Sequence, residues 1–351
     1  MLMLSNKLAK VAAKFTLAIV MVSALILATI PGCTEEEAEP VHLKVAVLPY
    51  ITFATFYIAL DEGYFAEQGL DVEMVKFTSV TQAMPLLSQG DLDVAGGPMS
   101  ASLFNAIGQD VNIKIVAGKE YNTTEGEHAS LMVRKDLYDS GELDSIPEMK
   151  GRQVAIASLA NIQHFQLAKI LETGNLTLDD VTIVKMGPAD VLAAFENGAI
   201  EAALIGDPYN AQIKDLGYAV TLISFEKVVP TFQIGYIMYG PSLLEGNQET
   251  GKKFMVAYLK GARQFAQGKT ERNLEILEDF LGIDRETLLE IGWNRIRLDG
   301  LMPVEDIMAF QDWAYENGFV DQKVSAEQLV DTTFIDYANS VLGPATETPF
   351  G

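Results

Sequence analysis

The sequence predicts an α/β protein of two lobes, each built on a mostly parallel sheet that helices flank. Short β-branched apolar runs alternate with helical stretches along most of the chain, which is typical of parallel sheets. The run Gln-Gly-Asp-Leu-Asp-Val-Ala at 89–95 has a counterpart, Asn-Gly-Ala-Ile-Glu-Ala-Ala, at 197–203, so the same unit occurs twice. With 351 residues, the chain is also long for a single core.

The first 42 residues are expected to be a targeting segment and a tether. A basic region precedes the apolar run 15–30, which is short for a membrane span of about 20 residues. The run ends in Ile-Pro-Gly-Cys, which resembles a bacterial lipobox, although Pro31 departs from the usual residue. We therefore expect a signal peptide at 1–32, a diacylglycerol anchor on Cys33 and a solvated tether at 33–42. An uncleaved signal anchor would also place the protein outside the cytoplasm. Cys33 is the one cysteine of the chain, so no disulfide can form within it.

Lobe I is expected to comprise residues 43–133 and 225–351. Its first part should contain strands at 44–48, 71–75, 91–95 and 112–116, with a further apolar run at 129–133. Helices should follow the aromatic stretch 49–57 and end at Gly63, and should cover 82–89 and 101–107. After a return strand at 233–239, the sequence predicts helices over 254–265, 273–281, 285–292, 304–317 and 326–330.

Lobe II is expected at 134–224. It should begin with a polar passage over 134–149 and continue with strands at 153–157, 181–185, 202–205 and 219–223 and helices at 164–172 and 191–197. The chain would then cross between the lobes near 133–135 and again near 224–231. Two such crossings form a natural hinge.

Composition and motifs exclude several function classes. The net charge of −23 argues against nucleic-acid binding, which needs a basic face. The three histidines are not at metal-ligand spacing, and no catalytic motif is found. We expect no cofactor, no metal and no enzymatic activity.

Two linked blocks carry a resemblance to a known family. Asp-Glu-Gly-Tyr-Phe-Ala-Glu-Gln-Gly-Leu-Asp-Val at 61–72 and Leu-Leu-Ser-Gln-Gly-Asp-Leu-Asp-Val-Ala at 86–95 resemble the opening of periplasmic solute-binding proteins of ABC importers. The group concerned handles nitrate, sulfonates, taurine, and thiamine or riboflavin precursors. The resemblance implies a type II-like two-lobed fold, a ligand held between the lobes, action as a monomer, and a permease and its ATPase as partners. The fungal synthase of the thiamine pyrimidine is similar too, but its cysteine-rich iron-binding motif is absent here.

The candidate ligand-binding residues lie at predicted strand ends, where parallel sheets bind ligands. Lobe I and the returning crossover supply Tyr50, Phe53, Tyr57, Gly97, Ser100, Tyr121 and Phe232. Lobe II supplies Ser158, Asn161, His164, Asp190, Asp207 and Tyr209. Ser158 and Asn161 could equally be helix caps, and Asp190 is most simply an N-cap. Asp207 occupies a position before proline where the resembling family often has a ligand-facing acidic residue.

The residue types around these strand ends indicate the ligand class. Neither Lys nor Arg occurs in 49–61, 96–109 or 157–167, while aromatic rings are frequent. This pattern favours a largely neutral heteroaromatic nutrient such as riboflavin or a thiamine pyrimidine precursor. The alternative of the same fold is a nitrate, taurine or alkanesulfonate that depends on helix N-termini or on Lys119. A ligand sensor for a membrane receptor is the alternative of another class.

Overall fold

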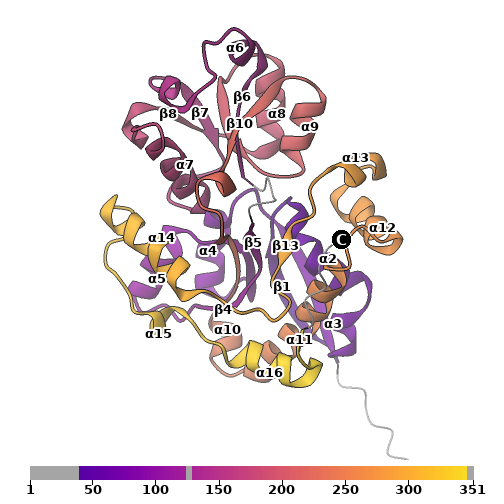
Figure 1. Ribbon diagram of the computed structural model, residues 1–351. Coiled ribbons are helices and arrows are strands. Elements are labelled where there is room, and N and C mark those ends of the chain that lie inside the picture. Colours follow the sequence, from indigo (N-terminus) through magenta and orange to yellow (C-terminus); the bar gives the residue numbers. More distant parts are fainter. Residues whose placement is uncertain (1–38, 124–128, 346–351) are drawn as a thin grey trace, which may run out of the picture. The chain divides into compact units, whose positions relative to one another are not determined.

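The computed structural model describes residues 39–123 and 129–345, and the fold is built on two five-stranded sheets, one in each lobe (Figure 1). The expected signal peptide, Cys33 and most of the tether lie outside the described residues. The lobe I sheet comprises β1 (Val41–Val47), β2 (Leu70–Lys76), β3 (Val94–Pro98), β4 (Lys114–Gly118) and β12 (Gly235–Tyr239). The lobe II sheet comprises β6 (Ser130–Arg134), β7 (Gln153–Ile156), β8 (Thr182–Lys185), β9 (Ala202–Ile205) and β10 (Ala219–Ser224).

The two sheets have the same topology. In lobe I the order is β2-β1-β3-β12-β4, with β1 parallel to β2 and β3, and β12 antiparallel to β3 and β4. In lobe II the corresponding order is β8-β7-β9-β6-β10, with β6 antiparallel to both neighbours. Each reversed strand is the first to follow a crossing from the other lobe. The predicted repeat and the mostly parallel sheets are therefore confirmed.

Strand β1 shows why the sheets need helices on both faces. Val45 and Val47 pack into one apolar cluster, with α2 (Ala54–Asp61) and α11 (Gln248–Phe265), while Ala46 packs into another, with α4 (Val80–Gln89) and α5 (Ala101–Gly108). Successive strand residues point to opposite faces, so a strand buried on both faces must be apolar at consecutive positions.

The remaining helices complete the two lobes. Lobe I also has η1 (Ile51–Phe53), α3 (Tyr64–Glu67), α10 (Pro241–Leu244) and α16 (Thr333–Leu342). Lobe II has α6 (Lys135–Asp139), η2 (Ile146–Met149), α7 (Ile162–Glu172), η3 (Leu178–Asp180), α8 (Pro188–Glu196) and α9 (Tyr209–Asp215), and η4 (Phe225–Lys227) follows β10. The C-terminal part adds α12 (Glu271–Leu281), α13 (Arg285–Glu290), α14 (Val304–Glu316) and α15 (Ala326–Leu329).

A small third sheet joins the two crossings. It consists of β5 (Glu120–Asn122) between β11 (Phe232–Gln233) and β13 (Arg295–Ile296), all antiparallel. Asn122 Nδ2 on the first crossing donates to the carbonyl of Val229 on the second, at 2.6 Å. The backbone N–H of Phe225 donates to the carbonyl of Ala129 at 2.8 Å. The two connections between the lobes are thus bonded to each other.

The position of β6 corrects the first predicted crossing. Ser130–Val133 pair with β9 of lobe II, so the lobe boundary expected after Val133 falls inside a lobe II strand. The crossing instead precedes Ser130. An isolated apolar run does not encode which sheet it joins, and the sequence therefore did not settle this point. The other predicted lobe boundaries, at residues 43, 224/225 and 351, remain predictions.

Several helical segments also differ from expectation. The passage 134–149 contains α6 and η2, and α3, α9 and α16 were not predicted. Helix α8 begins at Pro188 with Gly187 as its N-cap, so Asp190 lies inside the helix and is not the cap. Proline at the first helical position has a φ that suits a helix start, which explains the earlier beginning.

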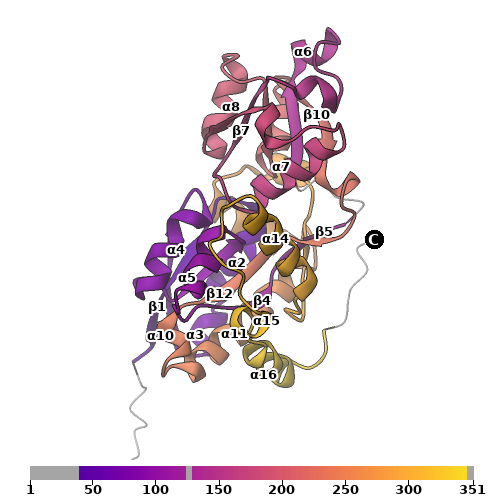
Figure 2. The same ribbon diagram turned by 90° about the vertical axis from the view of Figure 1, so that its left-hand side faces the viewer.

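Helix α7 of lobe II packs on α14, which belongs to the C-terminal part (Figures 1 and 2). Their contact is formed by rings that we call the α7–α14 aromatic cluster: His164, Phe165, Phe232, Phe310, Trp313 and Phe319. The same apolar core continues from one lobe into the other through this cluster. None of the helices in the described part of the chain has the length and hydropathy needed to cross a bilayer.

Candidate functional site

A cavity lies where the strand ends of the two lobes face each other. Leu48 and Pro98 line it at the carboxyl ends of β1 and β3, and Ala157 and Ile205 line it at those of β7 and β9. Its empty space is about 800 Å³, part of which is open to solvent. This is the position at which open α/β sheets bind ligands, and the volume is in the range of small-molecule sites.

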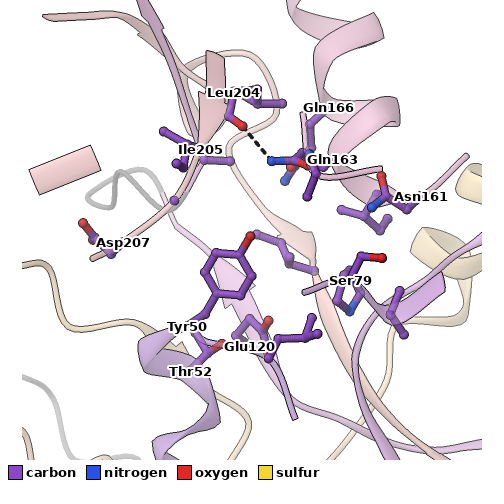
Figure 3. Close-up of a pocket in the computed structure, with 18 of the residues that line it drawn as sticks. Tyr50, Thr52, Ser79, Glu120, Asn161, Gln163, Gln166, Leu204, Ile205 and Asp207 are labelled. Carbon is purple, nitrogen blue, oxygen red and sulfur yellow. Dashed lines mark hydrogen bonds between the residues drawn. The ribbon is translucent and has the colours of Figure 1, made fainter. Parts of the chain in front are cut away.

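Polar side chains reach the cavity from both lobes (Figure 3). Lobe I and the C-terminal part supply Tyr50, Thr52, Thr78, Ser79, Glu120 and Asn294. Lobe II supplies Asn161, Gln163, Gln166 and Asp207. In Figure 3, Tyr50, Thr52 and Glu120 lie on one side of the space, and Gln163, Gln166 and Leu204 lie on the other.

The aromatic wall of lobe I is fixed by close packing on β3. The Phe53 ring stacks on Phe56 at 6.0 Å between centroids. A Cβ at Gly96 would lie 2.6 Å from Cε2 of Phe56 and 3.1 Å from Cε1 of Phe53. Glycine at 96 therefore gives both rings room against the sheet, and this packing holds Phe53 at the cavity.

The wall of lobe II is the first turn of α7. Asn161 is the N-cap, and its Oδ1 accepts from the backbone N–H of His164 at 3.0 Å. Gln163 accepts from the N–H of Ala157 at 2.7 Å and donates to the carbonyl of Leu204 at 2.6 Å. Both amide atoms of Gln163 are therefore engaged within the protein, and they tie α7 to the ends of β7 and β9.

Gln166 lies one turn further along the same helix, and its amide differs from that of Gln163 in its hydrogen bonding. The residue is 3% exposed, and it lines the cavity. Nε2 of Gln166 is buried and has no hydrogen-bond partner in the described structure. Burying an unsatisfied donor of this kind costs about 1–3 kcal/mol.

Glu120 and Asp207 are the charged residues among those that line the cavity in the described structure, and no Lys, Arg or His is among them. Lys119 is fully buried behind this lining: its Nζ donates to Glu120 and lies 4.0 Å from the centroid of the Phe53 ring. Burial lowers the pKa of Lys119, and the neighbouring Glu120 carboxylate opposes that shift. Lys119 therefore lies outside the cavity lining, although it contacts a carboxylate that belongs to it.

Asp207, like Glu120, has a lysine nearby that does not line the cavity. Lys269 lies near it on the C-terminal part, where its Nζ donates to the carbonyls of Leu289 and Ile291 at 2.5 and 2.8 Å. Burial lowers the pKa of Lys269, and Asp207 acts in the opposite direction. A Cβ on Gly292 would approach Oδ2 of Asp207 to 2.9 Å, so this lobe II residue reaches the segment after α13 closely.

Four of the residues that the sequence singled out line the cavity: Tyr50, Phe53, Asn161 and Asp207. Tyr209 lies beside it, with its ring edge-on to Tyr50 at 6.5 Å. Burial raises the pKa of Tyr50, with a smaller contribution from Tyr209, so the Tyr50 phenol is neutral at physiological pH. Oγ of Ser158 accepts from Nδ2 of Asn161 at 2.9 Å, and Oγ of Ser100 lies 2.8 Å from Oγ of Ser102.

The other candidates lie away from the cavity lining. Tyr57 stacks on Phe280 at 4.7 Å in the lobe I core, and Phe232 stacks on Phe165 in the aromatic cluster. Tyr121 lies under the guanidinium of Arg297, at 4.3 Å. The backbone of Gly97 is buried with φ at +149°, which L side chains rarely adopt, and Asp190 is exposed at the start of α8.

His164 is part of the aromatic cluster. Its Nδ1 accepts from the N–H of Ala160 at 3.1 Å, and its ring meets Trp313 edge-on at 5.5 Å. Burial lowers the pKa of His164 to about 4, so the ring is neutral near pH 7. In the described residues, no group of three or more His, Cys, Asp or Glu could hold a metal ion.

Several lining residues were missed by the sequence analysis. Gln163 and Gln166 could have been found, because two amides three residues apart in a helix that follows a strand share one face. Glu120 directly follows an apolar strand and Lys119, which is also a signal for a charge held near a strand end. Thr52, Thr78, Ser79 and Asn294 carry no local signal that separates them from surface loop residues.

The lobes bond to each other at one edge of the cavity. The N–H of Ala101 donates to the carbonyl of Ala160 at 2.7 Å, and the N–H of Ile162 donates to the carbonyl of Met99 at 3.0 Å. Ala160 adopts φ of +55°, a left-handed conformation that is unfavourable for residues with a Cβ. The carbonyl of Ala160 in lobe II thereby accepts from the first N–H group of α5 in lobe I.

Comparison with known proteins identifies relatives of this architecture. A family model described as NMT1/THI5 like matches residues 51–270. A putative binding protein of Brucella abortus (strain 2308) is 26% identical over 234 residues, which are 66% of this chain and 68% of that protein. A putative aliphatic sulfonates-binding protein of Bacillus subtilis (strain 168) is 21% identical over 293 residues, covering 80% and 83% of the two chains.

A solved structure shares the fold. The periplasmic nitrate-binding protein NrtA of Synechocystis PCC 6803 superposes with a TM-score of 0.73 and 14% identity, over 89% of this chain and 93% of that one. The predicted two-lobed binding-protein fold is confirmed.

The strained turn at Ala160 leads to a prediction about stability. Ala160→Gly should raise the free energy of unfolding by roughly 0.5–1 kcal/mol, because glycine adopts positive φ without a steric penalty. Ala193→Gly is the matched control: Ala193 is exposed inside α8, where the same change should cost about 1 kcal/mol. Urea unfolding of both variants gives the two values. A loss of stability in Ala160→Gly would contradict the strain argument.

Proposed function

Because the chain belongs to the NMT1/THI5-like family, we propose that it is the solute-binding component of an ABC importer. In this role it holds a small nutrient between its lobes and presents it to a membrane permease that a partner ATPase drives. The nutrient is a largely uncharged heteroaromatic molecule, such as riboflavin or a pyrimidine precursor of thiamine. The protein acts as a monomer outside the cytoplasm.

The observation that carries this ligand class is the charge of the cavity lining. The lining residues that the structure describes include two carboxylates and no basic side chain. An anion 4 Å from a carboxylate is disfavoured by about 4 kcal/mol at an effective dielectric constant of about 20. Lys119 offsets part of this near Glu120, but its ammonium is buried and donates to that carboxylate. A neutral or cationic ligand meets no such opposition.

Fewer aromatic rings line the cavity than the sequence predicted, so stacking gives weaker support to the proposal. Of the rings expected around the ligand, Tyr50 and Phe53 line the cavity. A stacked ring pair contributes about 0.5–1.5 kcal/mol beyond burial, so these two rings favour a planar ligand. The cavity amides and hydroxyls then supply the hydrogen bonds that orient it.

A sulfonate or nitrate is the second candidate, and the names of relatives favour it. The Bacillus subtilis relative is described as binding aliphatic sulfonates, and NrtA as binding nitrate. An anion in this cavity would depend on neutral amides and helix N-termini. Lys119, which the sequence suggested for this purpose, would first have to leave Glu120.

A sensor role and an enzymatic role are less well supported. A sensor would bind its ligand in the same cavity and close in the same way. The two roles therefore differ in the membrane partner, which is a receptor for a sensor and a permease for a transport protein. The iron chemistry of the similar fungal synthase needs a cysteine-rich motif, and Cys33 is the one cysteine of this chain. We therefore propose a binding protein without catalytic activity.

Ligand binding would act by closing the lobes, and we propose that the opening lies on the α9–α13 side. On the opposite side, where α7 and α14 lie at the left of Figure 1, the α7–α14 aromatic cluster joins the lobes through apolar packing. On the α9–α13 side, the Asp215 carboxylate lies near Glu290 and raises its pKa. Like charges oppose closure there, and a ligand that touches both walls would shift the equilibrium toward the closed state.

The ligand class can be tested by thermal unfolding. Riboflavin or 4-amino-5-hydroxymethyl-2-methylpyrimidine, at about 100 times its dissociation constant, should stabilise the protein by about 2.7 kcal/mol. At about 2–4 °C per kcal/mol, the melting temperature should rise by several degrees. Taurine and nitrate are the comparison ligands. If they shift the melting temperature and the heterocycles do not, the second candidate is correct.

The direction of opening can be tested with spin labels on the protein without its signal peptide, with Cys33→Ser to remove the native thiol. A label pair at Leu216, the exposed C-cap of α9, and Glu286, exposed on α13, should come closer when the ligand saturates the protein. A pair at Gln109 and Asn175, exposed on the other side, should change less. Equal distances with and without ligand at both pairs would remove closure from the proposal.

The expected lipid anchor on Cys33 is a further part of the proposal. Cys33→Ala in the full-length protein should leave the chain without fatty acid and shift it from the membrane to the soluble fraction. Labelling with radioactive palmitate measures this directly. Label that still enters the Cys33→Ala protein would exclude Cys33 as the attachment point.

A further inference from the structure

We propose that Gln166 and Glu120 select the ligand together: the amide of Gln166 donates to an acceptor atom of the ligand, and the carboxylate of Glu120 accepts from an N–H group. The ligand is then a neutral or cationic nitrogen heterocycle that carries a donor and an acceptor and no anionic group. This inference rests on the proposed function and deepens it.

The first support is the contrast between the two amides on the cavity face of α7. Gln163 and Gln166 are three residues apart and both line the cavity. Gln163 uses both amide atoms to hold Ala157 and Leu204. Gln166 is equally close to the cavity, yet its buried Nε2 has no partner in the described structure. Buried polar groups are nearly always paired, so an unpaired donor at a cavity indicates a partner that enters with the ligand.

The second support is the way in which Glu120 is held. Its side chain lies against Gly235 of β12, where a Cβ would be 2.0 Å from Oε2 and 2.5 Å from Oε1. The φ of Gly235 is not in the left-handed region, so the backbone does not require glycine there. The space is needed for the carboxylate. Lys119 donates to Glu120 from the buried side, and Glu120 itself lines the cavity.

The two groups come from different lobes and lie on different sides of the space (Figure 3). A ligand that satisfies both must offer an acceptor toward lobe II and an N–H toward lobe I. A pyrimidinedione edge, as in riboflavin, and an aminopyrimidine both combine these groups in one ring. Nitrate or a simple alkanesulfonate offers acceptors alone, and it would leave the carboxylate of Glu120 facing a like charge.

The test of Gln166 uses two readouts, titration calorimetry with riboflavin and with 4-amino-5-hydroxymethyl-2-methylpyrimidine, and the melting temperature of the ligand-free protein. Gln166→Met should weaken binding of whichever heterocycle the wild-type protein binds by at least tenfold. It should not lower the melting temperature without ligand, because Nε2 of Gln166 has no partner to lose in the described structure. Gln163→Met is the matched control and should lower that temperature, since it breaks two hydrogen bonds.

The test of Glu120 uses its neighbour, because replacing Glu120 itself would leave Lys119 buried without its partner. Gly235→Ala should displace the carboxylate and weaken heterocycle binding by at least tenfold. Gly187→Ala is the control, since a Cβ there has ordinary contacts, the nearest at 3.5 Å. If Gly235→Ala does not fold, Gln166→Met still tests the part of the inference that concerns Gln166, and unchanged heterocycle affinity in that variant overturns the joint selection.

The outcomes separate this inference from the proposed function. Wild-type protein that binds a heterocycle, with Gln166→Met and Gly235→Ala binding it equally well, overturns the inference and leaves the proposed function standing. A lower melting temperature for ligand-free Gln166→Met, matching that of Gln163→Met, also overturns it. Wild-type protein that binds neither heterocycle contradicts the proposed ligand class and this inference with it.

Discussion

The packing of α7 against α14 is the interaction on which both the cavity and the contact between the lobes depend. One face of α7 carries His164 and Phe165 into the aromatic cluster, where Trp313 meets both rings. The other face carries Gln163 and Gln166 to the cavity. Because a helix is rigid over three turns, the cluster fixes the distance of these amides from lobe I. Sequence changes in α14 would therefore alter ligand binding without touching the ligand.

Both carboxylates that line the cavity have a lysine nearby that does not line it. Glu120 and Asp207 line the cavity, while Lys119 and Lys269 lie near them outside the lining. A buried carboxylate without a cation would be costly, and a cation within the cavity would attract anions. Lysines behind the carboxylates stabilise the charge and leave acceptor atoms facing the ligand. The charge near the cavity is therefore locally balanced, although the described lining itself carries carboxylates and no basic side chain.

The fold was predictable from sequence to a greater extent than the site. Alternation of apolar runs and helices predicted most of the elements, and the repeat at 89–95 and 197–203 predicted the two lobes, since both signals are local. The membership of β6 was not predictable, because pairing partners are set by tertiary contacts. At the site, the strand-end rule located Tyr50, Asn161 and Asp207. It could not separate them from Tyr57 and His164, because which face of a helix meets the cavity depends on packing.

The position of β12 has a consequence for biogenesis. All five strands of the lobe II sheet lie between Ser130 and Ser224, so that lobe is continuous in the chain. The lobe I sheet needs Gly235–Tyr239 between β3 and β4, and these residues follow the whole of lobe II. As the chain emerges from its N-terminus onward, β3 and β4 keep unpaired edges until lobe II has followed, and such edges favour association with other chains. Lobe II is thus the natural first folding unit, and the nascent lobe I is the part that a chaperone has most reason to protect.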